Sequence, residues 1–204
     1  MLTPLLQAKS LPNIKILATG GTIAGAGNSP TDTNYTSGQI KPEQLTGQIY
    51  EIEDIANISA EQIAAIGSQN LNNTLLLQLA QRINTLLASE KVDGVVITHG
   101  TDTLEETAYF LKLTVKSNKP VVLTGAMRPA TAISADGPLN LLNAIVVASA
   151  ETSKNRGVLV AINGAVMDAR DVTKMNTTNV QTFQSPNFGN LGFIPGWLSR
   201  ALTG

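Results

Sequence analysis

Four short apolar runs alternate with helical patterns along the chain, and this alternation limits the fold more than any other feature of the sequence. The runs are residues 14–19 (IKILAT), 94–98 (GVVIT), 120–124 (PVVLT) and 157–162 (GVLVAI). Strands that are apolar throughout are typical of a parallel sheet whose two faces are both covered by helices. The sequence therefore predicts an α/β fold with a mostly parallel, mixed sheet flanked by helices on both faces.

Three amphipathic segments supply the helices for this sheet. Residues 74–89 place their leucine and isoleucine side chains on one helical stripe. A second helix is expected over residues 104–115, where Thr103 and Glu106 have the spacing of a capping box. A third is expected over residues 138–150, because an Asp-Gly-Pro sequence opens it.

The composition requires a buried core and leaves room for one domain. Hydrophobic residues make up 43% of the 204 residues and charged residues 14%, which excludes a disordered chain and a coiled coil. The net charge of −1 offers no basic surface for nucleic acid, and no apolar run reaches the ~18 residues that cross a membrane. We expect a domain over residues 11–194 after a disordered or signal-remnant tail at residues 1–10.

The chain contains no cysteine and a single histidine, His99. These counts exclude disulfides, thiolate catalysis, zinc ribbons and iron–sulfur clusters, and they rule out a metal site built from several histidines. We interpret His99 as a structural residue at the end of a strand rather than as a base. The chemistry is therefore expected from hydroxyl groups, carboxylates or lysine.

Short polar motifs follow three of the predicted strands: residues 19–22 (TGGT), 98–102 (THGTD) and 124–128 (TGAMR). Ligands of open α/β sheets bind beside the carboxyl ends of the strands. The TGGT motif lacks the GK[ST] sequence of a P-loop and the spacing of a dinucleotide fingerprint, which disfavours nucleotide binding. A purely structural glycine turn remains the alternative reading of this motif.

Two further features could contribute to a site at these strand ends. Residues 25–38 form a long polar loop with one aromatic residue, Tyr35, and such loops are either lids or surface excursions. Lys174 lies in a polar stretch, where a solvated lysine is the ordinary reading. Burial beside a hydroxyl would instead favour its neutral amine and make it a proton acceptor for Thr101. Thr101 and Asp102 are also compatible with helix capping.

Seven motifs occur in a fixed order: residues 16–24 (ILATGGTIA), 34–36 (NYT), 66–69 (IGSQ), 97–103 (ITHGTDT), 124–129 (TGAMRP), 134–138 (SADGP) and 168–174 (DARDVTK). Together these motifs closely resemble the bacterial-type L-asparaginases, and most of all their type II, high-affinity branch. The resemblance covers nearly the whole chain, from about residue 11 to residue 194. It implies the larger N-terminal domain of the asparaginase fold.

The resemblance also implies the reaction and the residues that perform it. Members of the family hydrolyse L-asparagine to L-aspartate and ammonia, often with some activity on L-glutamine, through an acyl-enzyme on threonine and without a cofactor. By motif, Thr22 is the nucleophile and Tyr35 its activating neighbour on the lid. Thr101 with Lys174 forms the second catalytic pair, which activates the attacking water or assists the nucleophile.

Three further residues are implied in substrate binding. Asp102 takes the α-ammonium group of the substrate, Ser68 holds its α-carboxylate, and Gln69 lines the same pocket. A carboxylate and a neutral hydroxyl are chemically suited to the two charged groups of a free amino acid.

The chain departs from the family pattern at its end. Family members carry a second, smaller domain, and their tetramers complete each site with residues of a neighbouring subunit. Here residues 195–204 do not resemble the family's linker, so we expect an atypical C-terminal tail with the second domain absent. Two hypotheses follow: an L-asparaginase, or a truncated, catalytically silent domain that only binds aspartate or asparagine weakly.

The resemblance carries expectations about assembly and location as well. It implies a homo-oligomer, since full-length members of the family are tetramers. It also implies a periplasmic location, because the type II branch is typically exported. A cytoplasmic location is the alternative, since residues 1–10 (MLTPLLQAKS) lack an intact signal sequence.

Overall fold

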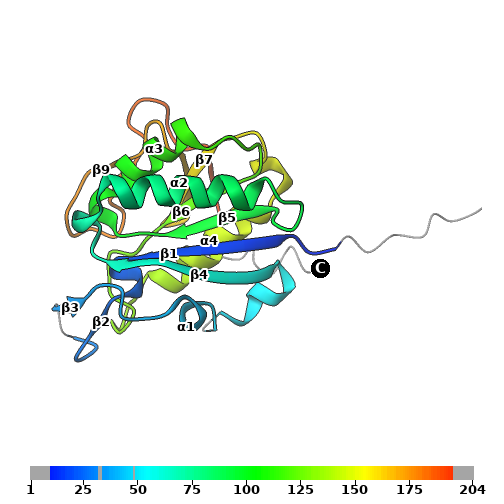
Figure 1. Cartoon of the computed structure of the whole chain (residues 1–204). Coiled ribbons are helices and arrows are strands. Elements are labelled where there is room, and N and C mark those ends of the chain that lie inside the picture. The colour runs from blue at the N-terminus through cyan, green and yellow to red at the C-terminus, as the bar shows by residue number, and fades with distance from the viewer. Residues whose placement is uncertain (1–9, 32–33, 48, 195–204) are drawn as a thin grey trace, which may run out of the picture.

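A seven-stranded mixed sheet forms the centre of the protein, in the strand order β11-β8-β7-β6-β5-β1-β4 (Figure 1). The structure is a computed structural model that describes residues 10–31, 34–47 and 49–194. The tails expected at residues 1–10 and 195–204 lie outside the described residues, apart from Ser10.

Five neighbouring strands of the sheet, β4, β1, β5, β6 and β7, run parallel to one another, whereas β8 is antiparallel to both β7 and β11. The prediction of a mostly parallel, mixed sheet is therefore confirmed. The seven strands are β1 (Asn13–Gly20), β4 (Asn57–Ile66), β5 (Gly94–Thr98), β6 (Val121–Thr124), β7 (Val158–Ile162), β8 (Ala165–Asp168) and β11 (Gly192–Phe193).

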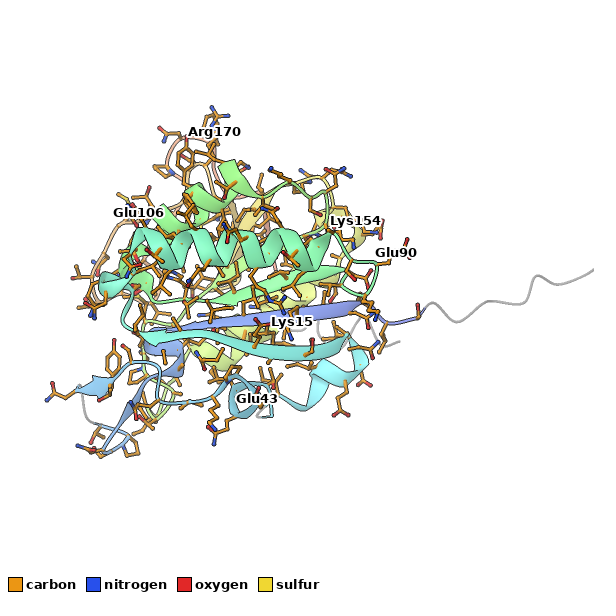
Figure 2. The ribbon with its side chains drawn as sticks, in the orientation of Figure 1. Lys15, Glu43, Glu90, Glu106, Lys154 and Arg170 are labelled. Atoms are coloured by element: carbon orange, nitrogen blue, oxygen red, sulfur yellow. The ribbon has the colours of Figure 1, made fainter. Side chains whose placement is uncertain are left out.

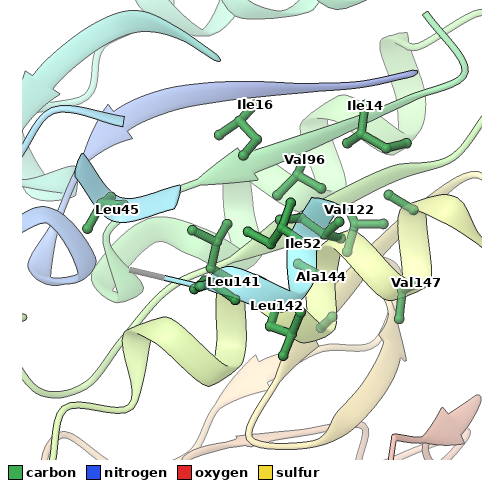
Figure 3. Packing of buried hydrophobic residues seen from close by; sticks show 14 of the residues in the cluster. Ile14, Ile16, Leu45, Ile52, Val96, Val122, Leu141, Leu142, Ala144 and Val147 are labelled. Atoms are coloured by element: carbon green, nitrogen blue, oxygen red, sulfur yellow. The ribbon is translucent and has the colours of Figure 1, made fainter. Parts of the chain in front are cut away.

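Helices cover both faces of this sheet. On one face lie α2 (Asn73–Leu87) and α3 (Leu104–Thr114), and on the other lie α1 (Pro42–Thr46) and α4 (Gly137–Ser149) (Figure 1). Successive strand residues point to opposite faces, so Val95 and Ile97 pack under α2 and α3, while Val96 joins the cluster under α4 (Figure 3). In the part of the chain that the structure describes, every helix is too short or too polar to span a bilayer.

The three predicted helices are present, with ends shifted by one or two residues. The side chain of Asn72 caps α2 by accepting the backbone N–H of Leu75 at 3.0 Å. Asp136 immediately precedes α4, and a proline lies in the first turn of that helix, as the sequence pattern predicts. These helices therefore follow from local signals.

The edge strand β4 was missed by sequence reasoning because it is half-buried and carries polar residues. Its Glu61 lies 2.7 Å from Arg82 of α2 and 3.7 Å from Lys15 of β1. Hydrogen bonds from Arg82 lower the pKa of the Glu61 carboxyl and outweigh burial, which raises it. An edge strand that holds such a polar network lacks the continuous apolar run of a central strand.

Short elements at the carboxyl ends of the strands present the polar motifs. Single turns of 3₁₀ helix follow β1, β4 and β5: η1 (Thr22–Ala24), η3 (Ser68–Asn70) and η4 (Thr101–Thr103). The expected long loop contains a two-stranded ribbon of β2 (Ala26–Gly27) and β3 (Tyr35–Thr36). A second ribbon pairs β9 (Thr173–Lys174) with β10 (Phe183–Gln184). Two other single turns are η2 (Tyr50–Asp54) and η5 (Glu151–Ser153).

Candidate active site

The backbones of β1, β4 and β5 come unusually close together where these strands end. Gly20 and Gly21 have φ angles of 106° and 78°, in the region that favours glycine. A Cβ at Gly21 would lie 2.4 Å from the Cα of Gly100, and one at Gly20 would lie 2.4 Å from the carbonyl oxygen of Ile66. This approach brings the turns η1, η3 and η4 to one place.

Thr22 and Tyr35 meet through their hydroxyl groups. Thr22 begins η1 and is only 7% exposed, and its Oγ1 lies 2.5 Å from the Oη of Tyr35. Tyr35 reaches it from the β2–β3 ribbon. The backbone N–H of Gly27 donates to Oγ1 of Thr131 at 2.9 Å, which ties this ribbon to the loop after β6. The long polar loop, which the sequence leaves open between a lid and a surface excursion, therefore places its aromatic residue on the buried threonine.

Thr101, Asp102 and Lys174 form a second cluster. The Nζ of Lys174 donates to Oγ1 of Thr101 at 2.9 Å and to Oδ1 of Asp102 at 2.8 Å. The Lys174 side chain is 14% exposed, whereas that of Asp102 is 64% exposed. Lys174 is thus not a solvated surface lysine, and the carboxylate of Asp102 faces both the lysine and solvent.

Ser68 lies beside Gly100 and Thr103, at the junction of η3 and η4. A Cβ at Gly100 would lie 2.7 Å from the Oγ of Ser68, which shows how closely the two turns pack. The Ser68 hydroxyl accepts the N–H of Thr103 at 3.3 Å, while the Thr103 hydroxyl donates to the Ser68 carbonyl at 3.0 Å. Gln69, the next residue of η3, is exposed.

The prediction of a capping box at the start of α3 is wrong. Thr103 does occupy the N-cap position, but its side chain makes no capping hydrogen bond. Its hydroxyl is engaged by the carbonyl of Ser68, which lies 35 residues earlier in the chain. A tertiary contact has therefore replaced the local one that the spacing predicted.

The arrangement offers hydroxyl groups, one carboxylate and one ammonium group to a small polar molecule. An open cavity of about 500 Å³ lies against the second cluster; its lining residues are Asp102, Glu105, Lys174, Met175, Asn176 and Thr177. Among the described residues, no group of three or more His, Asp or Glu side chains is placed to hold a metal ion. The clusters can therefore supply nucleophilic oxygen, proton transfer and charge pairing.

Comparison with known proteins decides the family. A family model described as "Asparaginase, N-terminal" matches residues 13–200. The chain belongs to the asparaginase family.

Relatives and solved structures agree with this family. The chain is 59% identical to "L-asparaginase 2" of Escherichia coli (strain K12), over 92% of this chain and 53% of that protein. It is 50% identical to "Glutaminase-asparaginase" of Pseudomonas fluorescens biotype A, over 90% of this chain and 51% of that protein. The chain spans about half the length of the curated relatives it matches.

The similarity extends to the three-dimensional structure. A solved structure, "Crystal Structure of Probable Cytoplasmic L-asparaginase from Campylobacter jejuni", superposes with a TM-score of 0.88 at 55% identity. The match covers 90% of this chain and 56% of that chain. The fold described above is thus the fold of this region of an asparaginase.

Two acidic residues that sequence reasoning did not assign to the site hold the backbone of this asparaginase domain. The carboxylate of Asp136 accepts the N–H groups of Met127 and Arg128 at 3.0 and 2.9 Å and thereby shapes the loop after β6. The carboxylate of Glu105 accepts the N–H of Lys174. The sequence marks Asp136 only as a helix start and gives no local signal for Glu105, because their partners lie 8 and 69 residues away.

His99 has the structural role that the sequence predicts. It is fully buried; its Nδ1 lies 2.7 Å from the carbonyl oxygen of Gly100, and its Nε2 lies 3.1 Å from Oγ1 of Thr107. A carbonyl oxygen can only accept, so Nδ1 carries the proton and Nε2 accepts the hydroxyl of Thr107. Burial lowers the pKa of His99 below its ordinary value of 6.5, although the hydrogen bond to Gly100 opposes this.

Replacing Gly21 with alanine should destabilise the domain, because the new Cβ would collide with the backbone of Gly100 at a left-handed φ. We expect the free energy of unfolding to fall by about 3 kcal/mol or more. Urea unfolding measures this loss. Gly192→Ala is the matched control, since no atom of the described residues lies within 4 Å of its added Cβ. Equal stability of the two variants would contradict the close approach of β1 and β5.

His99 should make the domain less stable as the pH falls below about 6.5. The folded state keeps His99 neutral, whereas the unfolded chain binds a proton near the ordinary pKa of 6.5. The contribution of neutral His99 to the free energy of unfolding is therefore fully present above pH 6.5. It is lost as the pH falls toward the lowered pKa of the folded state. Since His99 is the single histidine, urea unfolding between pH 7.5 and 5 should show a slope that is absent in His99→Gln. The same slope in both proteins would refute this assignment.

Proposed function

We propose that the chain carries an L-asparagine amidohydrolase site that releases L-aspartate and ammonia through an acyl-enzyme on Thr22. The observation that carries the proposal is the pairing of two threonines with separate partners at adjacent strand ends. Thr22 Oγ1 lies 2.5 Å from Tyr35 Oη, and Thr101 Oγ1 lies 2.9 Å from Lys174 Nζ. The name of the Escherichia coli relative, "L-asparaginase 2", supports the choice of substrate.

In the first half-reaction, Thr22 attacks the side-chain amide carbon of asparagine. A threonine hydroxyl is a weak nucleophile and needs a partner that takes its proton as the bond forms. Tyr35 can act as that partner by accepting the proton of Thr22 and passing its own proton to the leaving nitrogen. The C–N bond breaks, ammonia leaves, and the aspartyl group remains as an ester on Thr22 Oγ1.

In the second half-reaction, water attacks this ester. Thr101 takes a proton from the water and passes its own hydroxyl proton on toward Thr22, while the ammonium group of Lys174 orients the Thr101 oxygen by donating a hydrogen bond to it. The proton passes to Thr22 as its ester bond breaks, which releases aspartate and restores the free hydroxyl. Asp102 holds Lys174 in place through the contact of 2.8 Å with its Oδ1.

The residues around these threonines can bind the two charged groups of an amino acid. One oxygen of the exposed Asp102 carboxylate accepts from Lys174, and the other remains for the substrate's α-ammonium group. Ser68 Oγ accepts the N–H of Thr103, so its own proton remains for the α-carboxylate. Gln69 follows Ser68 on η3 and is proposed to line the same pocket.

We also propose that the protein is a homo-oligomer. Large apolar side chains lie exposed near the end of the described chain, namely Phe188, Leu191 and Phe193, and such groups commonly mark an interface. Sedimentation velocity should therefore report a species larger than the 21.4 kDa chain. A single species with the mass of one chain at all concentrations would contradict this proposal.

A periplasmic location is proposed from the names of the relatives. The chain is 61% identical to a Haemophilus influenzae protein named "Probable L-asparaginase periplasmic". The alternative is the cytoplasm, because the similar Campylobacter jejuni protein is called a "Probable Cytoplasmic L-asparaginase". Cell fractionation followed by detection of the protein distinguishes the two locations.

The decisive test of function is ammonia release from L-asparagine, with L-glutamine compared alongside. Thr22→Ala should lower the rate by about 10⁴-fold or more, because it removes the nucleophile. Tyr35→Phe should lower kcat by about 10²- to 10⁴-fold, the range of a lost proton-transfer partner. Tyr109→Phe changes an exposed tyrosine on α3 and should keep the parent rate.

Two results would overturn the proposal. If Thr22→Ala keeps the parent rate, the ammonia does not come from a Thr22 acyl-enzyme. If calorimetry shows weak binding of aspartate while neither L-asparagine nor L-glutamine is hydrolysed, the silent binding domain replaces the enzyme.

A further inference from the structure

Helix α3 holds the segment that bears Lys174 at two separate points. The Nζ of Lys112 lies 2.7 Å from Oδ1 of Asp168, at the start of this segment. The carboxylate of Glu105 accepts the backbone N–H of Lys174, at its end. Glu105 and Lys112 are seven residues apart and thus lie on one face of the helix. The segment from residue 168 to residue 174 is therefore fastened along that face.

The ribbon that contains Lys174 offers little support of its own. β9 pairs with β10 through only two residue pairs, Thr173 with Gln184 and Lys174 with Phe183. An isolated two-stranded ribbon is marginally stable at best, and this one is far shorter than most. Contacts outside the ribbon must therefore fix the backbone of Lys174.

The backbone position of Lys174 decides whether its ammonium group can reach Thr101. A lysine side chain has four rotatable bonds, and a shift at its backbone displaces the Nζ or forces it into a new rotamer. Thr101 and Asp102 bind the Nζ from η4, while Glu105 binds the N–H from the first turn of α3. One continuous stretch of chain, residues 101–105, thus holds Lys174 at both of its ends.

We propose that Glu105 is a positioning residue for the reaction: its carboxylate fixes the backbone of Lys174 so that the ammonium group reaches Thr101. This inference rests on the proposed amidohydrolase function for its effect on rate. Its effect on the Lys174 backbone does not depend on that function. The carboxylate acts here as a hydrogen-bond acceptor, so an uncharged acceptor of the same length should replace it.

The neighbouring residue provides a matched control. Glu106 has the same charge and lies in the same first turn of α3, but it is exposed (Figure 2). A general effect of negative charge near the start of the helix would be equal at both positions. An effect at Glu105 alone therefore reports its contact with Lys174.

The kinetic test uses the whole protein and ammonia release from L-asparagine. Glu105→Ala removes the acceptor and should lower kcat by about 100-fold with little change in KM, because misplacing a reacting group costs rates of this order. Glu105→Asp withdraws the acceptor by one methylene and should also lower kcat. Glu105→Gln keeps an acceptor oxygen and should stay within about threefold of the parent, as should Glu106→Ala.

A second measurement tests the same contact without any turnover. The amide hydrogen of Lys174 should exchange with solvent at least tenfold faster in Glu105→Ala than in Glu105→Gln, while amides of the central strands stay unchanged. In a Lys174→Met background, Glu105→Ala should produce no further loss of rate. If the parent itself lacks ammonia release dependent on Thr22, the proposed function fails, and the exchange measurement still decides the role of Glu105.

Three results would overturn the inference. The first is a kcat of Glu105→Ala equal to that of the parent. The second is an equal loss in Glu105→Gln and Glu105→Ala, which would assign the effect to charge. The third is unchanged exchange at the Lys174 amide in both variants.

Discussion

The close packing of β1 against β4 and β5 at Gly20 and Gly21 is the constraint on which the site depends. Because neither glycine has a side chain, the three strand ends approach until their backbones touch. The turns that follow then present Thr22, Ser68 and Thr101 at one edge of the sheet. The hydroxyl groups are thus brought together by main-chain geometry, and the sheet beneath them is a support whose central strands β5, β6 and β7 are buried throughout.

The contacts that complete the site come from segments outside the parallel sheet. Tyr35 arrives on the β2–β3 ribbon and Lys174 on the β9–β10 ribbon, and each touches a threonine that follows a central strand. The buried part of the candidate site is therefore built from the core, while the side chains that contact its two threonines are supplied by short ribbons. Loops that carry function on a rigid scaffold are common in α/β proteins.

The sequence alone predicts four of the five parallel strands and the three main helices, because each has a local apolar pattern. It did not predict β4, whose polar edge residues break that pattern. It did not decide whether Lys174 is a surface residue or part of the site, since the contact of Lys174 with Thr101 spans 73 positions. The sequence offered their contact as one of two interpretations, and the motif resemblance favoured it. The wrong prediction of a capping box at Thr103 has the same cause. The Thr103 hydroxyl binds a distant partner, the carbonyl of Ser68, and not a group in its own helix turn.

The β2–β3 ribbon has one more consequence. It consists of two residue pairs, and the hydrogen bond from Gly27 to Thr131 ties it to the loop after β6. Such a unit can open at a far lower free energy than the strands beneath it. Opening of the ribbon would separate Tyr35 from Thr22, which follows the central strand β1. The contact between the two hydroxyl groups therefore depends on the ribbon as well as on the core, and partial unfolding of the ribbon would break it in a protein whose sheet is still folded.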